Sequence, residues 1–305
     1  MSGPCLSCLG EMAEGEYHPR CLQLLFRTGR PPTVDVELGK LHALGLAMAG
    51  HVSLSGTQRK ISLGLSTDRM TLQLAIEGGR YILKPQAQTY PALPENEHAT
   101  MQLARAAGID TPPNAIVRLA DGSLAYVVVR FDRTAEGRKV RQDDFCQLAE
   151  KSPKENYDGS AELCARLVKQ FATEPLIEVL KLYRLLVFSW WVGNGDMHLK
   201  NFSLVATPDG RQALAPVYDQ VCTRLVIPGD QLALLVGGRK DGLDRATWLE
   251  FARYCGLPAR AAERVLHEVP GALAEAAALI GRSLLPVDMK RNYDALLRER
   301  SAVLA

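Results

Sequence analysis

The chain has 305 residues, of which 47% are hydrophobic and 23% charged, a composition typical of an ordinary globular protein. Its formal net charge is +2, so no strong positive field points to direct binding of DNA or RNA. The N-terminus lacks the basic start and apolar core of a signal peptide. The most apolar run, near residue 185, contains Lys181 and Arg184 and is too short to span a bilayer. We therefore expect a cytoplasmic protein without membrane contacts.

Cysteine usage divides the chain into a head and a body. The seven cysteines are odd in number, and four are scattered through the body, which indicates reduced thiols. The scattered set is Cys146, Cys164, Cys222 and Cys255. The head carries the pattern C-x2-C-x9-H-x2-C, formed by Cys5, Cys8, His18 and Cys21. Three thiolates and one imidazole are an accepted tetrahedral zinc set. Two interpretations stay open, a structural zinc site or a small reduced head whose cysteines simply pack.

The first half of the body has the periodicity of strands. A polar, Pro-rich connector ends the head, and the sequence predicts a head over residues 1–49 and a β-rich lobe over 50–135. The stretches "KISLGLS" and "MTLQLAI" alternate with period two, and Gly78-Gly79 turns the chain into "RYILKP". Pro85 should end that strand. "NEHATMQLARAAG" predicts a helix closed by Gly108, and "LAYVVVRF" a further strand.

Beyond Asp143 the helical period dominates, and the sequence predicts a larger helical lobe over 136–305. The helix from Pro175 to Val192 has apolar residues on nearly all of its faces and should be buried on most sides. The expected helices are "DDFCQLA", "SAELCARLVKQFA", "PLIEVLKLYRLLVFSWWV", "ATWLEFARYCG", "ARAAERVLHEV" and "MKRNYDALLRER". A small sheet-rich part followed by a larger helical part predicts an α+β, two-lobed, protein-kinase-like fold.

A dense polar cluster, "GNGDMHLKNFSL", follows the most apolar helix. Asp196 precedes Asn201 by five positions, the spacing of a kinase catalytic loop, and Asp219 follows after a turn and a short strand. Such a loop needs an Asp that accepts the substrate hydroxyl proton and oxygen ligands that hold Mg²⁺ on the phosphates. Taken alone, Asp196 and Asn201 could also be a capped loop with an Asx-turn.

Upstream residues supply the other parts of a phosphoryl-transfer site. Lys84 lies on the predicted strand "YILKP", and Glu97 on the next helix could pair with it, although Glu95 is a rival. "SLSGTQRK", residues 53–60, could cradle phosphates through backbone N–H groups, but it holds a single glycine. The strand end at Val129 and Phe131 should leave backbone groups free to bind adenine.

These motifs, in order, resemble the HipA-like toxin kinases. The resemblance covers roughly residues 50–225 and rests on "SLSGTQRK", "YILKP", "RFDR", "QDDFCQ", "GNGDMHLKNFSL" and "YDQVCT", followed by "LVGGRKDGLDRATWLEFARYCGL". It implies ATP binding by the loop and by several later residues. This set is Ser55, Gly56, Thr57, Lys84, Val129, Phe131, Gln142, His198, Tyr218 and Asp219. Gln142 could instead only start a helix, and His198 could only pack the loop.

Within the resemblance, Asp196 is the catalytic base, and Asn201 and Asp219 are the Mg²⁺ ligands. Lys200 should contact the transferred phosphate or Asp196, unless it is a solvated surface charge.

The chain is most similar to the short HipT type, because full-length HipA proteins have about a hundred further residues before the phosphate loop. The HipT resemblance implies autophosphorylation at Ser53 or Ser55. It also implies an aminoacyl-tRNA synthetase substrate, tryptophanyl if the likeness is close, and as partners a small HipS-like antitoxin and a HipB-like DNA-binding protein.

The function favoured is an ATP- and Mg²⁺-dependent Ser/Thr protein kinase of a toxin–antitoxin system. The alternatives are a small-metabolite kinase and a non-catalytic kinase-like binding module.

Overall fold

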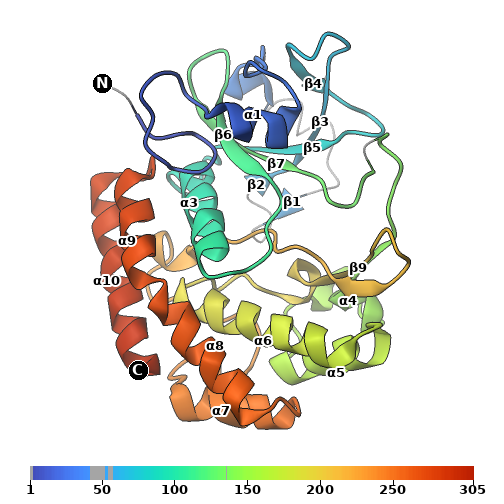
Figure 1. Cartoon of the computed structure of the whole chain (residues 1–305), viewed down its shortest axis with the longest axis vertical. Helices are drawn as coiled ribbons and strands as arrows, with labels where there is room; N and C mark the ends of the chain where they lie inside the picture. Colours follow the sequence, from blue (N-terminus) through green and yellow to red (C-terminus); the bar gives the residue numbers. More distant parts are fainter. Residues whose placement is uncertain (1–2, 42–51, 54–57, 135) are drawn as a thin grey trace. The chain divides into compact units, whose positions relative to one another are not determined.

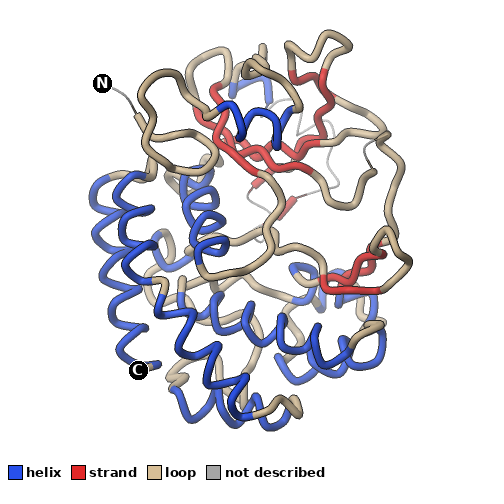
Figure 2. Tube along the Cα trace, viewed as in Figure 1, coloured by secondary structure: helices blue, strands red, loops and turns tan. Residues whose placement is uncertain are grey.

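The computed structural model describes residues 3–41, 52–53, 58–134 and 136–305. The chain divides into two compact units. One contains most of the strands and the other most of the helices (Figures 1 and 2). Unit 1 comprises Met1–Gln102, Pro112–Lys139 and Leu279–Pro286, and unit 2 comprises Leu103–Thr111, Val140–Ala278 and Val287–Ala305. The domain scheme predicted from the sequence, with boundaries after residues 49 and 135, stays a prediction.

Unit 1 is built on a five-stranded antiparallel sheet of order β4-β3-β5-β7-β6 (Figure 1). The central strand β5 pairs through Leu83 with Ile61 of β3 on one side and with Val127 of β7 on the other. The strands are β3 (Ile61–Leu65), β4 (Leu72–Leu74), β5 (Tyr81–Pro85), β6 (Asn114–Arg118) and β7 (Leu124–Val129). As predicted, β5 ends at Pro85, which has no N–H to continue the ladder.

The described part of unit 1 also includes two helices and a pair of short strands that lie outside this sheet. Helix α1 (Pro19–Phe26) packs on the sheet through Phe26, whose ring lies 5.7 Å from that of Tyr81. Helix α3 (Leu93–Ala106) begins in unit 1 and ends in unit 2. Strands β1 (Val52–Ser53) and β2 (Gln58–Arg59) form an antiparallel hairpin. The sequence did not predict α1, which is a helix of only eight residues within the head.

Unit 2 is mainly helical, with one small sheet of order β10-β9-β8 (Figure 2). Helices α5 and α8 pack against α6, and α7 packs against α8 (Figure 1). The strands are β8 (Gln142–Asp144), β9 (Ser203–Ala206) and β10 (Gln212–Leu214), with 3-10 turns at η1 (Pro153–Glu155), η2 (Leu199–Asn201) and η3 (Thr223–Leu225). The helices are α4 (Phe145–Leu148), α5 (Ala161–Phe171), α6 (Pro175–Trp191), α7 (Arg245–Tyr254), α8 (Ala259–Gly271), α9 (Leu273–Arg282) and α10 (Val287–Leu304).

Three helices differ from what the sequence predicted. The helix expected over "DDFCQLA" begins only at Phe145, because Asp143 and Asp144 belong to β8 and the Asp144 side chain caps α4. The buried helix α6 is exposed in its first turn, where Leu176 and Ile177 face solvent. Helix α9, which the sequence patterns did not predict, follows α8 almost directly, after Pro270 and Gly271.

No helix among the described residues is long and apolar enough to cross a membrane.

The uneven burial of α6 gives a stability prediction. Leu182 is fully buried, whereas Leu176 on the same helix is 62% exposed. We expect Leu182→Ala to lower the free energy of unfolding by about 2–5 kcal/mol, because it leaves a cavity, and Leu176→Ala to change it by less than ~0.5 kcal/mol. Urea unfolding followed by tryptophan fluorescence measures this, since Trp190, Trp191 and Trp248 all lie in unit 2. Equal unfolding midpoints for the two variants would contradict the packing of α6.

Candidate active site

In unit 1, the central strand presents a buried lysine to a helix. Lys84 on β5 is 3% exposed, and its Nζ donates to Oε1 of Glu97 on α3 at 2.5 Å. The same ammonium lies 5.7 Å from the ring centroid of Tyr126 on β7, within cation–π range. Of the two glutamates that the sequence left open, the structure therefore pairs Glu97 with Lys84. Burial raises the pKa of Glu95, the rival carboxyl.

This ion pair is poorly explained by stability alone. The free energy needed to remove two charges from water is about as large as the free energy of their attraction. A buried ion pair therefore adds little net stability. Removing one partner, by contrast, leaves an unpaired buried charge and costs about 3–5 kcal/mol. A lysine held this rigidly is better explained as a positioned positive charge, the role that phosphoryl transfer requires of it.

In unit 2, the polar loop after α6 is folded tightly onto the chain around Thr223. Gly193 has φ +75°, a conformation that favours glycine. The Gly195 N–H donates to Thr223 Oγ1 at 2.8 Å, and the Thr223 hydroxyl is also hydrogen-bonded to Asp230. A Cβ on Gly195 would overlap the Asp230 carboxylate and the Gln231 carbonyl oxygen. Both glycines are therefore required by the geometry of the loop.

The loop brings the predicted base and metal ligand together. The Asn201 side-chain N–H donates to the backbone carbonyl of Asp196 at 2.7 Å, and the Asp196 N–H donates to Asn194 Oδ1 at 3.0 Å. Because its nitrogen is engaged, the Asn201 amide is oriented with its oxygen as the available acceptor. That oxygen suits a hard cation such as Mg²⁺.

Tyr157 is a site residue that the sequence patterns did not reveal. Its hydroxyl donates a short hydrogen bond to Oδ1 of Asp196, and its ring meets that of His198 edge-on at 4.9 Å. Burial, and then the hydrogen bond to Asp196, raise the pKa of Tyr157, so the hydroxyl keeps its proton. No motif marks this tyrosine, because it lies 39 residues before Asp196 in an irregular segment.

The second predicted metal ligand has an unusual backbone. Asp219 has φ +55°, the left-handed region that few residues other than glycine adopt. Such strained positions are concentrated at functional sites, where the surrounding structure holds them. The Asn194 amide, which also bonds the Asp196 N–H, donates to the carbonyl of Asp219 at 3.4 Å. One asparagine thus connects the segments that carry the two aspartates.

Three further predicted residues meet on the small sheet of unit 2 or next to it. The Gln142 amide on β8 donates to Ser203 Oγ at 2.9 Å, and the Tyr218 hydroxyl bonds the same oxygen at 3.2 Å and the Lys200 carbonyl at 3.0 Å. Lys200 itself is exposed. Burial raises the pKa of Asp144, and the positive charge of Lys200 partly offsets this rise. The catalytic role of Lys200 stays a prediction.

The predicted adenine hinge and phosphate loop both belong to unit 1. The Val129 N–H donates to the Pro113 carbonyl at 2.9 Å, so the expectation of a free amide at this strand end is wrong, because the sheet continues past it. The hinge role of Val129 and Phe131 stays a prediction. Ser55, Gly56 and Thr57 lie outside the described residues, and Ser53 pairs with Gln58 in the β1–β2 hairpin.

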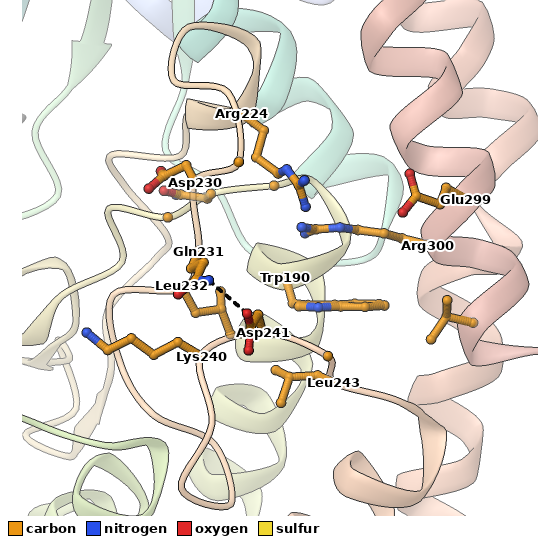
Figure 3. Close-up of a pocket in the computed structure, with 16 residues that line it drawn as sticks. Trp190, Arg224, Asp230, Gln231, Leu232, Lys240, Asp241, Leu243, Glu299 and Arg300 are labelled. Carbon is orange, nitrogen blue, oxygen red and sulfur yellow. Dashed lines mark hydrogen bonds between the residues drawn. The ribbon is translucent and has the colours of Figure 1, made fainter.

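A cavity of about 270 Å³ in unit 2 borders the polar loop at Gly193, Asn194 and Gly195 (Figure 3). Arg300 stacks on Trp190, with its guanidinium carbon 5.0 Å from the ring centroid, and points toward Arg224 (Figure 3). Burial, followed by the charge of Arg224, lowers the pKa of Arg300 to about 10. Asp196, Asn201 and Asp219 do not line this cavity, so it is separate from the predicted catalytic residues.

The family assignment agrees with this geometry. The model of the HipA-like C-terminal domain family matches residues 52–277, and the chain belongs to this family. The matched segment contains Lys84 and the whole polar loop. The resemblance inferred from the motifs is confirmed at the level of the family.

Known proteins similar to the chain come from several bacteria. "Putative kinase Y4mE" of Sinorhizobium fredii is 32% identical over 75% of this chain and 57% of its own length. A "Putative kinase" of Haemophilus influenzae is 33% identical over 56% of this chain and 52% of its own length. The chain thus spans about half the length of the curated relatives it matches.

Solved structures support the fold. The Shewanella oneidensis toxin–antitoxin complex of HipA, HipB and operator DNA contains a chain with a TM-score of 0.68 at 20% identity, covering 97% of this chain and 75% of that one. The Helicobacter pylori proinflammatory kinase CtkA has a TM-score of 0.59 at 14% identity, over 84% and 92%. The predicted α+β, kinase-like fold is confirmed.

The packing of the polar loop can be tested without measuring activity. We expect Gly195→Ala to lower the free energy of unfolding of unit 2 by about 1–3 kcal/mol, because the new methyl group displaces Asp230 or Gln231. Gly271→Ala is the matched control, since a Cβ there meets open space, and it should cost less than ~0.5 kcal/mol. Urea unfolding followed by tryptophan fluorescence compares the two. A Gly195→Ala protein as stable as the control would show that the loop is packed differently.

Proposed function

We propose that this chain is an ATP- and Mg²⁺-dependent Ser/Thr protein kinase that acts as the toxin of a toxin–antitoxin system. The observation that carries the proposal is the loop in which Asn201 is hydrogen-bonded to Asp196 at the spacing of a kinase catalytic loop. The family membership and the names of the relatives support it.

Each residue has a defined task in this proposal. Lys84, held by Glu97, orients the α- and β-phosphates of ATP, and Asp196 accepts the proton of the attacking hydroxyl. Tyr157 fixes the rotamer of the Asp196 carboxylate through its hydrogen bond. Catalysis then consists mostly of positioning and charge neutralisation.

Asn201 and Asp219 fit a magnesium ion by their donor chemistry. One amide oxygen and one carboxylate are the hard oxygen ligands that Mg²⁺ prefers, and the orientation of the Asn201 amide leaves its oxygen available. When bound, the ion would neutralise charge on the phosphates. The sequence motifs point to this ligand pair, and its role stays part of the proposal.

The substrate and the partners are finer parts of the proposal and rest on the family resemblance. We infer an aminoacyl-tRNA synthetase substrate, tryptophanyl if the chain is of the HipT type, whose phosphorylation would stop translation. The inferred partners are a small HipS-like antitoxin subunit and a HipB-like DNA-binding protein. The Shewanella HipA protein forms a toxin–antitoxin complex with HipB and operator DNA, and this complex supports the proposal of a comparable assembly.

The kinase proposal predicts that Asp196→Asn lowers phosphoryl transfer by roughly 10²–10⁴-fold while leaving ATP binding in place, because only the proton acceptor is lost. The exposed Asp288→Asn, on α10, is the control and should keep full activity. γ-labelled ATP with Mg²⁺ and a cell lysate measures the transfer, and mass spectrometry of the labelled band should identify a tRNA synthetase. Label found solely in small molecules would favour a metabolite kinase, and unchanged turnover in Asp196→Asn would overturn the mechanism.

A second prediction concerns the phosphate loop. We expect the active protein to carry phosphate on Ser53, Ser55 or both, and the Asp196→Asn protein to carry none. A phosphoserine adds about −1.5 to −2 charges at neutral pH, so a modified loop should bind ATP more weakly. Intact-mass spectra after incubation with Mg²⁺ and ATP measure the modification. Spectra of an active enzyme that lack any added phosphate would eliminate this switch.

A further inference from the structure

The N-terminal head gathers four potential metal ligands into one small volume. The Sγ atoms of Cys5, Cys8 and Cys21 and a ring nitrogen of His18 all lie within 4.8 Å of one another. Ligand bonds of zinc length around one centre would place such atoms roughly 3.6–3.8 Å apart. The pair Cys8 Sγ and His18 Nδ1 already lies at 3.3 Å. The four atoms therefore need only small shifts to surround one ion.

The histidine is oriented as a metal ligand would be. His18 Nε2 lies 3.0 Å from the Glu11 carbonyl oxygen, which can only accept a hydrogen bond, so this nitrogen carries the proton. The other ring nitrogen, Nδ1, then faces Cys8 with its lone pair. A backbone carbonyl that fixes the tautomer in this way is the usual outer partner of a metal-bound histidine.

The backbone around the ligands is also shaped for close approach. The Cys5 N–H donates to the Gly10 carbonyl at 2.8 Å, which closes the loop that carries the first two cysteines. A Cβ on Gly10 would lie 3.1 Å from the His18 ring and 3.3 Å from Cys8 Sγ, tighter than normal packing. Cys21 lies in the first turn of α1, where its N–H bonds the His18 carbonyl at 2.9 Å.

The same loop docks onto the part of unit 1 that positions Glu97. Ser7, between the first two cysteines, accepts from His98 Nε2 at 2.8 Å through its carbonyl oxygen, and His98 directly follows Glu97 on α3. The Leu6 carbonyl accepts from the Ile116 N–H at 2.8 Å, which covers the open edge of strand β6. The loop therefore contacts both α3 and the edge strand.

We propose that Cys5, Cys8, His18 and Cys21 bind one structural Zn²⁺ ion, and that this ion holds the loop against α3 and β6 and so positions the helix that carries Glu97. Three thiolates and one imidazole form a closed tetrahedral set with no position left for a substrate, which matches structural rather than catalytic zinc. The set contains no carboxylate, which argues against Mg²⁺ or Ca²⁺. The proposal does not depend on kinase activity.

Metal analysis of the purified chain tests the first half. We expect about one zinc per chain, lost in the double variant Cys5→Ser with Cys8→Ser and kept in Cys255→Ser, a buried cysteine of unit 2. The tryptophan fluorescence of unit 2 shows whether each variant has folded. A chain that takes up no zinc while its thiols are reduced, or a disulfide between Cys5 and Cys8, would overturn the site. Equal zinc in the double variant would mark an adventitious ion only.

Hydrogen exchange on the unmutated chain tests the second half. Removing zinc with a chelator should speed exchange of the Ile116 amide and of the first turns of α3 by at least roughly tenfold, because the loop that protects them is released. The amides of α6 in unit 2 are the internal control and should not change. If removal of the bound zinc left the amides of Ile116 and α3 protected, the ion would stabilise the head alone. The proposed coupling between the zinc site and α3 would then be wrong.

Discussion

Unit 1 depends on the buried ion pair between Lys84 and Glu97. Lys84 can reach Glu97 only because β5 is the central strand of the sheet and α3 packs close to it. Since an unpaired charge at either position would be costly, the pair fixes the register of α3 against the sheet. The head adds a second hold on the same helix through His98. The positioned lysine is thus the product of the sheet, the helix and the head together.

Unit 2 depends on a different feature, the close packing of a polar loop. Gly195 lies against Asp230 and Gln231 with no room for a side chain, and Thr223 connects this contact to the loop backbone. Tyr157 and Asn201 then hold Asp196 from its side chain and from its carbonyl. Such preorganisation is what a reaction with little covalent chemistry for the protein requires.

The family model assigns the chain to a family and the solved structures support the fold, and the site geometry adds what these comparisons leave open. The solved structures are less than 25% identical in sequence to this chain, so they support the fold and not the function. The curated relatives are about twice as long as the matched region. Function therefore rests on the side chains of the chain itself, chiefly those around Asp196 and Lys84.

Local patterns in the sequence determined strands β3, β4, β5 and β7 of unit 1, most of the helices of unit 2 and the order of the motifs, because period and turn residues are properties of neighbouring positions. The motifs also named Lys84, Asp196, Asn201 and Asp219. The tertiary structure alone decided that Glu97 rather than Glu95 pairs with Lys84, since both lie on the same helix and only packing distinguishes their faces. It alone introduced Tyr157, which no spacing connects to Asp196, and showed that the Val129 amide is already bonded. Contacts between residues far apart in the chain depend on three-dimensional packing, and a one-dimensional pattern does not encode them.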